Sequence, residues 1–262
     1  MIKELGTGLT VYFCVLSAVL GAVFGSFLNC AAWRIAHKMS FMKGRSLCPS
    51  CGHELRAIDL VPVLSWVFLK GKCRYCGEKI SARYPLTELI FAALTVLLFL
   101  KTGLSVFFIR DFILLCCLFC LSLVDLDIFE IPNACVLIPI GAFLAAAPFA
   151  DSPLDYLKTG AIGGFVLAGA ILLIVLIFDK VMGKETMGGG DIKLLFVAGL
   201  YLGLVTGLFG LILACLVGLI MAVVRKTKKG EPFPFGPAIA IALWIMLEYG
   251  GGFVDWYLGL FT

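Results

Sequence analysis

Two acidic segments place carboxylates at the ends of apolar stretches, where side chains of this type can do acid–base chemistry. Asp191 follows three consecutive glycines and opens one apolar stretch, while Asp125 and Asp127 stand at the end of another. A carboxylate beside hydrocarbon is energetically costly, and glycine lets a second chain approach the backbone closely. If the two segments meet, a pair of carboxylates could share one proton and activate a water molecule.

A simpler interpretation is that Asp191 only caps a helix. Aspartate is a common N-cap residue, and glycines are common in connecting loops. The presence of a second acidic segment of the same kind favours chemistry over capping, so we expect the carboxylates to act together.

The composition predicts a protein that crosses a membrane several times. Of the 262 residues, 61% are hydrophobic and only 15% are charged, and the mean hydropathy is +1.07. Long apolar runs separated by short charged loops are typical of polytopic membrane proteins. The pattern predicts an all-α fold with about eight spans, at residues 9–35, 86–104, 105–124, 134–150, 160–179, 192–206, 207–224 and 237–260.

The distribution of Lys and Arg predicts the orientation of these spans. The loops 37–84, 180–191 and 225–236 carry most of the basic residues, and eight spans place all three loops on one side. By the positive-inside rule that side is the cytoplasm. We therefore expect a cell (inner) membrane protein with both termini outside and both acidic segments at the cytoplasmic face.

The loop 37–84 contains two Cys-x-x-Cys pairs, each followed by glycine, with 21 residues between them. The four thiols belong to Cys48, Cys51, Cys73 and Cys76. This pattern is typical of a zinc ribbon, in which four thiolates bind one tetrahedral Zn²⁺. Two disulfides or free thiols are the alternatives, but a reducing cytoplasm disfavours disulfides. We expect no nucleic-acid partner, because a basic loop is usual beside anionic membrane lipid.

Eight motifs follow one another along nearly the whole chain. They are Gly25-Ser-Phe-Leu-Asn29 with Arg34, Arg45-Ser-Leu-Cys48-Pro-Ser-Cys51, Pro62-Val-Leu-Ser-Trp66, Gly71-Lys-Cys73-Arg-Tyr-Cys76, Arg83-Tyr-Pro85 with Glu88, Asp125-Leu-Asp-Ile-Phe-Glu-Ile-Pro-Asn133, Gly188-Gly-Gly190-Asp191-Ile-Lys193 and Pro234-Phe-Gly-Pro237. In this order and at this spacing they resemble a known family, the bacterial type IV prepilin peptidases. The last but one matches the Gly-x-Gly-Asp motif of that family. Two departures are Asp59-Leu-Val-Pro62, where relatives often have Asn-Ile-Pro, and Asn133, where relatives often have an acid.

The resemblance implies an aspartic endopeptidase whose catalytic residues are Asp125 and Asp191. Gly188, Gly190 and Lys193 would support the second aspartate as parts of its motif. In such a pair one carboxylate is the general base on water, while its protonated partner bonds the peptide carbonyl. Side chains two residues apart at a helix end point in different directions. We therefore expect Asp127 and Glu130 to face water or a basic neighbour such as Lys193.

The substrate that the resemblance implies is a prepilin or pseudopilin, whose short basic leader is cut after glycine. Relatives with the four-cysteine segment also methylate the new amino terminus with S-adenosylmethionine. Gly71 and Lys72 match positions tied to that activity, although a turn glycine and a surface lysine would look the same.

The expected domains are a first transmembrane helix at 1–36, a cytoplasmic zinc-binding insert at 37–84 and a seven-helix membrane peptidase domain at 85–262. Two other kinds of protein fit parts of the pattern. A secondary transporter could use Asp125 and Asp191 as proton or ion sites. A scaffold for pilus assembly would need no chemistry at all. Neither would cut a prepilin.

Overall fold

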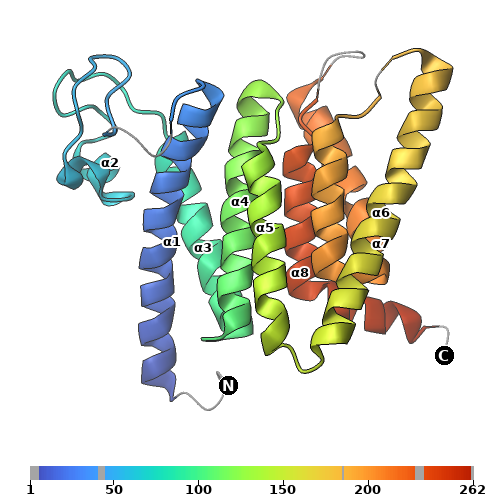
Figure 1. The fold of residues 1–262 in the computed structure, drawn as a ribbon. Helices are drawn as coiled ribbons and strands as arrows, with labels where there is room; N and C mark the ends of the chain where they lie inside the picture. Colours follow the sequence, from blue (N-terminus) through green and yellow to red (C-terminus); the bar gives the residue numbers. More distant parts are fainter. Residues whose placement is uncertain (1–5, 41–44, 185, 228–232, 261–262) are drawn as a thin grey trace. The chain divides into compact units, whose positions relative to one another are not determined.

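A computed structural model describes residues 6–40, 45–184, 186–227 and 233–260. The regular structure in these ranges is helical apart from two isolated β-bridges. The α-helices (Figure 1) are α1 Thr7–Ala36, α2 Leu64–Phe68, α3 Arg83–Thr102, α4 Val106–Ile128, α5 Asn133–Ala146, α6 Pro153–Met182, α7 Gly189–Arg225 and α8 Gly236–Leu258. Two short 3₁₀ helices, η2 Ala57–Leu60 and η3 Ala147–Phe149, lie between them. The predicted all-α class is confirmed.

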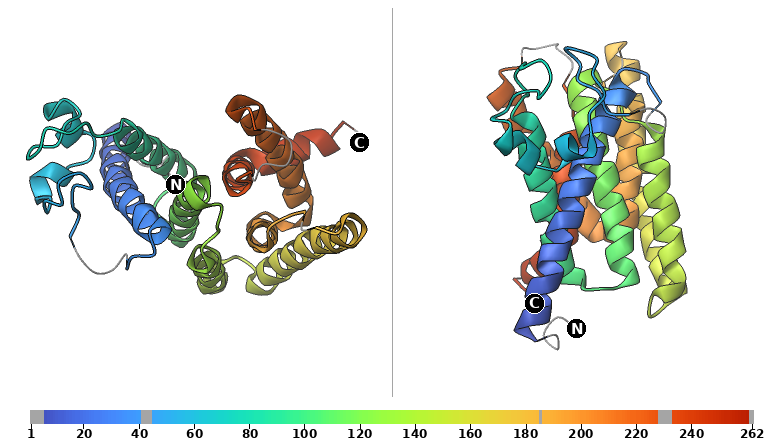
Figure 2. Two further views of the ribbon diagram at one scale, coloured as in Figure 1. Left: turned by 90° about the horizontal axis from the view of Figure 1, so that it is seen from above. Right: turned by 90° about the vertical axis from the view of Figure 1, so that its left-hand side faces the viewer.

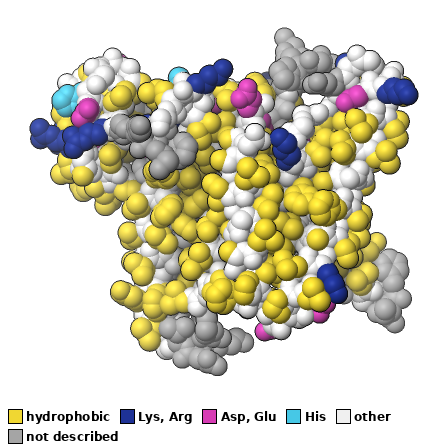
Figure 3. Space-filling view, viewed as in Figure 1, with side chains coloured by type: hydrophobic (Ala, Val, Ile, Leu, Met, Phe, Trp, Pro, Cys, Tyr) yellow, Lys and Arg dark blue, Asp and Glu magenta, His cyan; other side chains and the backbone are white. Residues whose placement is uncertain are grey.

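Within the described ranges, 6 helices are long and apolar enough to cross a membrane, namely α1, α3, α4, α6, α7 and α8. The segment Asn133–Phe149, which contains α5, is a shorter apolar helix. Hydrophobic side chains cover much of the helix surface (Figure 3), as expected for helices that contact lipid. The predicted multi-pass membrane protein is therefore confirmed, with six candidate spans where eight were predicted. The predicted spans 192–206 and 207–224 both lie in α7, and the span 134–150 corresponds to the shorter apolar helix.

The chain forms two compact units, Met1–Phe108 and Ile109–Thr262, which we call unit 1 and unit 2. Unit 1 contains α1, α2, α3 and the four cysteines, and unit 2 contains most of α4 and all of α5 to α8. The division at Phe108 differs from the predicted boundary at residue 85. It groups α3 with α1, because these two helices pack tightly against each other.

Close packing of α1 on α3 in unit 1 depends on glycine. A side chain at Gly21 would lie 2.7 Å from the Cα atom of Ala92, and one at Gly25 would lie 3.1 Å from the Cα atom of Glu88. Without side chains at these two positions the backbones can approach, which is how small residues join helices in membranes. The amide of Asn29 then donates a hydrogen bond to the hydroxyl of Thr87 at 2.7 Å.

In unit 2, α6 packs against α7 through a second set of glycines. A side chain at Gly160 would lie 2.7 Å from the carbonyl oxygen of Leu200, and Gly163 lies directly against the backbone of Gly199 and Gly203. The Tyr201 hydroxyl donates to the Pro139 carbonyl at 2.8 Å and so joins α7 to α5. These contacts fix the first part of α7 between two neighbouring helices.

The helix α7 is interrupted at Gly203, whose φ of 73° and ψ of −177° are not helical. A side chain added at Gly207 would lie 3.7 Å from the Cα atom of Gly199, although eight residues of a straight helix span about 12 Å. The chain therefore turns back at Gly203, and α7 consists of two arms, residues 189–202 and 204–225 (Figures 1 and 2). Only glycine adopts this conformation without strain.

Candidate active site and four-cysteine centre

The carboxyl group of Asp125 lies in the last turns of α4 and is almost fully buried, with 5% of the residue exposed. Its Oδ2 atom accepts the backbone N–H of Gly236, the first residue of α8, at 2.9 Å. A side chain at position 236 would come within 2.8 Å of the same oxygen. Glycine at position 236 therefore lets the start of α8 donate directly to the carboxylate, and a helix amino terminus favours negative charge.

The second carboxyl group, that of Asp191, lies in the first turn of α7 and is half-buried. It is not the cap of this helix, because the N-cap is Gly188 and no side-chain cap bond is made there. The backbone N–H of Asp191 instead donates to the carbonyl of Gly188 at 3.1 Å. Capping therefore does not explain the carboxylate at this position.

Ile131 connects the surroundings of the two carboxylates. Side chains added at Gly190 and at Gly236 would lie 3.0 Å and 3.4 Å from atoms of Ile131. Asp125 lies close enough to Asp191 for its charge to act on that carboxyl group, and the Oδ2 atom of Asp125 is bonded to Gly236 beside Ile131. The structure thus brings together two aspartates that are 66 positions apart in the sequence, at one end of unit 2.

The other polar residues of the two motifs lie at the surface. Asp127 and Glu130 are exposed, whereas Asp125 is buried, as the different directions of neighbouring side chains require. The ammonium group of Lys193 donates to the side-chain oxygen of Asn133 at 3.1 Å. This bond joins the start of α7 to the start of α5, so Lys193 helps to position the backbone around Asp191.

The four cysteines of unit 1 form a single cluster. Their sulfur atoms all lie within 4.8 Å of one another, and the Cys48 and Cys76 sulfurs are 4.0 Å apart. Tetrahedral Zn²⁺ with Zn–S bonds of about 2.3 Å would hold its sulfurs about 3.8 Å apart, whereas a disulfide needs about 2.05 Å. The geometry therefore fits a metal centre.

Each Cys-x-x-Cys pair adopts the same small turn. The N–H of Cys48 donates to the carbonyl of His53 at 3.0 Å, and the N–H of Cys73 donates to that of Glu78 at 2.8 Å. Gly52 and Gly77 take positive φ angles of 70° and 74° to close the turns. Such turns present both thiols of a pair to one ion.

Asp59 braces the second turn from outside the cluster. Its carboxylate accepts hydrogen bonds from the Arg74 guanidinium at 2.6 Å and from the Tyr75 hydroxyl at 2.9 Å. Burial alone would raise the pKa of Asp59, but these two hydrogen bonds lower it below its ordinary value. Asp59, the first residue of the segment that departs from the family pattern, thus contributes to the structure around the cysteines.

Gly71 and Lys72 differ in their surroundings. Gly71 is buried, has a φ of +69° and lies beneath Trp66, where a side chain would come within 2.9 Å of the indole. Lys72 is exposed and forms a β-bridge with Lys79. Of these two residues only the glycine shapes the interior of unit 1.

Sequence reasoning assigned no role to Gly236 or Ile131, although both lie beside the aspartates. Gly236 belongs to the Pro234–Pro237 motif, so the sequence indicated that this position matters but not that it binds Asp125. Ile131 lies inside the Asp125 motif and looks like any apolar residue there. No sequence pattern could show that it contacts two glycines from distant helices.

Comparison with known proteins agrees with these features. Residues 19–102 match the bacterial peptidase A24 N-terminal domain, and residues 112–223 match the type IV leader peptidase family. The chain is 34% identical to the prepilin leader peptidase/N-methyltransferase of Bacillus subtilis (strain 168), over 92% of this chain and 96% of the relative. Proteins of the same name from Pseudomonas putida and Aeromonas salmonicida (strain A449) are 35% and 32% identical, over 91% and 98% of both chains.

The chain therefore belongs to the type IV leader peptidase family. No solved structure matches it.

Proposed function

We propose that this protein removes the leader from type IV prepilins and then methylates the new amino terminus. The names of its full-length relatives describe both activities. The observation that carries the peptidase assignment is the convergence of Asp125 and Asp191 at one end of unit 2. Two carboxylates in a poorly solvated place cannot both ionise easily, which is the condition for an aspartic peptidase.

The residues account for each step of peptide hydrolysis. The ionised member of the pair takes a proton from a water molecule, whose oxygen attacks the scissile carbonyl carbon. The protonated member donates a hydrogen bond to the carbonyl oxygen and then gives its proton to the leaving amine. The pair titrates as a unit, so the two roles are shared between Asp125 and Asp191. The exposed glycines at 188 and 189 leave room for a substrate backbone beside Asp191.

The substrate is a prepilin or pseudopilin with a short basic leader, cut after the glycine that precedes its apolar helix. A substrate of this kind lies across the membrane surface, which suits carboxylates at the ends of transmembrane helices. The membrane lipid is then a partner of enzyme and substrate alike.

Two cofactors belong to this proposal. Zn²⁺ bound by Cys48, Cys51, Cys73 and Cys76 stabilises the segment around them, because so short a segment has little core of its own. S-adenosylmethionine supplies the methyl group. The division into domains at 1–36, 37–84 and 85–262 stays a prediction.

We also propose that the chain crosses the membrane eight times, since the reversal at Gly203 makes α7 two antiparallel arms. With eight crossings, the zinc centre and the two aspartates face the cytoplasm, and both termini lie outside. A reporter fused after Lys226 should report cytoplasm, and one fused after Asp151 should report the outside. The opposite pattern would contradict this topology.

The deciding experiment is incubation of the purified protein with membrane-embedded prepilin, followed by mass spectrometry. We expect a product cut after glycine and, with S-adenosylmethionine present, 14 mass units heavier, as one methyl group replaces one hydrogen (about 14 Da). A transporter or an assembly scaffold would leave the prepilin whole.

A further inference from the structure

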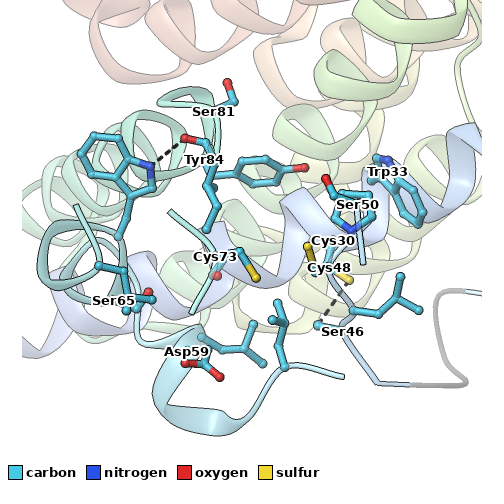
Figure 4. Close-up of a pocket in the computed structure, with 18 of the residues that line it drawn as sticks. Cys30, Trp33, Ser46, Cys48, Ser50, Asp59, Ser65, Cys73, Ser81 and Tyr84 are labelled. Carbon is cyan, nitrogen blue, oxygen red and sulfur yellow. Dashed lines mark hydrogen bonds between the residues drawn. The ribbon is translucent and has the colours of Figure 1, made fainter. Parts of the chain in front are cut away.

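Unit 1 contains a cavity of about 400 Å³, and the residues that line it belong to this unit. Its walls are the last turns of α1, the first turns of α3 and the four-cysteine segment between them. Figure 4 shows Trp33 of α1 and Tyr84 of α3 among the side chains that line it. The volume lies within the range of about 300–1,000 Å³ that is usual for small-molecule sites.

A carboxylate that is almost fully buried lines this cavity. Glu88 of α3 is 7% exposed, and its Oε2 atom accepts the backbone N–H of Val63 at 2.7 Å. A carboxylate can accept about four hydrogen bonds, so one backbone N–H uses only part of its capacity. A buried carboxylate of this kind can bind a cationic ligand group.

The bond from Val63 holds a strained turn beside the cavity. Val63 has a φ of 59° and a ψ of −51°, a region that β-branched residues rarely occupy. The N–H of Leu64 donates to the carbonyl of Pro62 and closes a three-residue turn around it. Strained turns of this kind cluster at ligand sites, where the surrounding structure stabilises them.

Aromatic rings also line the cavity, beside further charged side chains that include the buried Arg34. Trp33, Trp66 and Tyr84 all line the cavity. The indole N–H of Trp66 donates to the carbonyl of Ile80 at 3.0 Å, and Gly71 lies against its ring, as described above. The orientation of this ring is therefore fixed from two sides.

From these features we propose that the cavity binds S-adenosylmethionine, with Glu88 and the aromatic rings around its cationic sulfonium group. The inference rests on the proposed methyltransferase activity and adds the place where the methyl donor binds. Aromatic faces and a desolvated carboxylate attract a cation, and the same rings can stack on the adenine base. Gly71 is a positioning residue, because it acts through Trp66.

Methyl transfer from such a site balances in atoms and charge. The neutral amine at the new amino terminus of the pilin attacks the methyl carbon, and an N–C bond forms as the S–C bond breaks. The electrons of that bond go to sulfur, which leaves as the neutral thioether of S-adenosylhomocysteine. The methylated ammonium carries the positive charge and loses a proton to water.

The loss of charge at sulfur gives a sharp binding test. Isothermal titration of the purified zinc-loaded protein with both ligands should show S-adenosylmethionine binding more tightly than S-adenosylhomocysteine. In Glu88→Gln we expect binding of the charged ligand to weaken about tenfold or more, since a charge-assisted contact is lost. Binding of the neutral ligand should change little.

Suitable controls separate this effect from misfolding. The glutamine oxygen can still accept the Val63 N–H, so zinc content and the unfolding temperature should be unchanged in Glu88→Gln. Glu54→Gln removes an exposed glutamate of the same unit that does not line the cavity, and it should bind both ligands normally. Gly71→Ala should weaken donor binding while zinc is retained, because it displaces Trp66.

A second measurement locates the donor directly. Labelled S-adenosylmethionine cross-linked by ultraviolet light should attach to peptides containing Trp33, Trp66 or Tyr84. Attachment only to peptides of unit 2, or normal affinity for the charged ligand in Glu88→Gln, would overturn the site while leaving the methyltransferase function intact. If the unmutated protein neither binds the donor nor methylates pre-cut pilin, the site and the proposed methylation both fail.

Discussion

The four-cysteine cluster and the aspartate pair are assembled over different distances in the sequence. In unit 1 each cysteine pair lies on a turn closed by hydrogen bonds between residues no more than five positions apart. In unit 2 the carboxylate of Asp125 is bound by Gly236, which is 111 positions away. The cysteine cluster thus depends on local turns, whereas the aspartate pair depends on how whole helices pack. Each centre should therefore be removable without the other.

The largest effect is expected from the carboxylates themselves. Asp125→Asn and Asp191→Asn should each reduce prepilin cleavage by about 10³-fold or more, because an amide can neither take the proton of water nor share one. The amide oxygen at position 125 can still accept the Gly236 N–H, so the fold should survive. Cleavage is followed by mass spectrometry, with zinc content as the check on unit 1.

Asp127→Asn is the matched control for this pair. It changes an exposed acid two positions from Asp125 and should keep substantial cleavage. Both inactive variants should still methylate pilin supplied already cut, because methyl transfer does not use the carboxylates. Cleavage at the unmutated rate by the Asp191 variant would refute the aspartic mechanism.

Loss of one thiolate should disrupt the four-cysteine cluster of unit 1. The unmutated protein should contain about one zinc per chain, and Cys51→Ser should release it and expose residues 45–80 to protease, because metal binding and folding are coupled. Metal analysis and limited proteolysis measure the two effects. Cys215→Ser alters an exposed cysteine of α7 and should keep its zinc, whereas zinc-free protein prepared without chelator would disprove the metal centre.

The packing of unit 2 can be broken at a single glycine. Gly163→Val would force a side chain into the backbone of Gly199 and Gly203, and overpacking of this kind costs about 1–3 kcal/mol. We expect a lower unfolding temperature and weaker cleavage. Gly169→Val lies on the same helix with nothing within 4 Å, so an equal loss in both variants would show that the contact with α7 is unimportant.

The smallest effect is expected from the hydrogen bonds that Asp59 accepts from Arg74 and Tyr75. Because its pKa is lower in the folded protein than in the unfolded chain, its contribution is present above about pH 4 and is lost as the pH falls through the folded value. Asp59→Asn should make residues 45–80 more sensitive to protease at pH 7, and the difference from the unmutated protein should shrink in acid. A difference that grows in acid would contradict this assignment.

The local features of the protein were predictable from sequence patterns. Of the long-range features, only the pairing of Asp125 with Asp191 was predicted, from the family resemblance. Apolar runs showed where the helices lie, and the Cys-x-x-Cys spacing showed which thiols meet. The contact of Ile131 with both Gly190 and Gly236 depends on how α7 and α8 pack, and the packing of distant helices is not encoded in a local pattern. The cavity around Glu88 could not be predicted for the same reason, because its walls come from three separated segments.

The turn at Gly203 also has a consequence for the lipid around the enzyme. The first arm of α7 and the helix α5 each have 14 residues, which gives a length of about 21 Å. The hydrocarbon core of a typical bilayer is about 30 Å thick. Both short helices begin near the aspartates, where Lys193 bonds Asn133. Hydrophobic mismatch should then thin the membrane beside the active site, so the acyl-chain length of the lipid becomes a determinant of the cleavage rate.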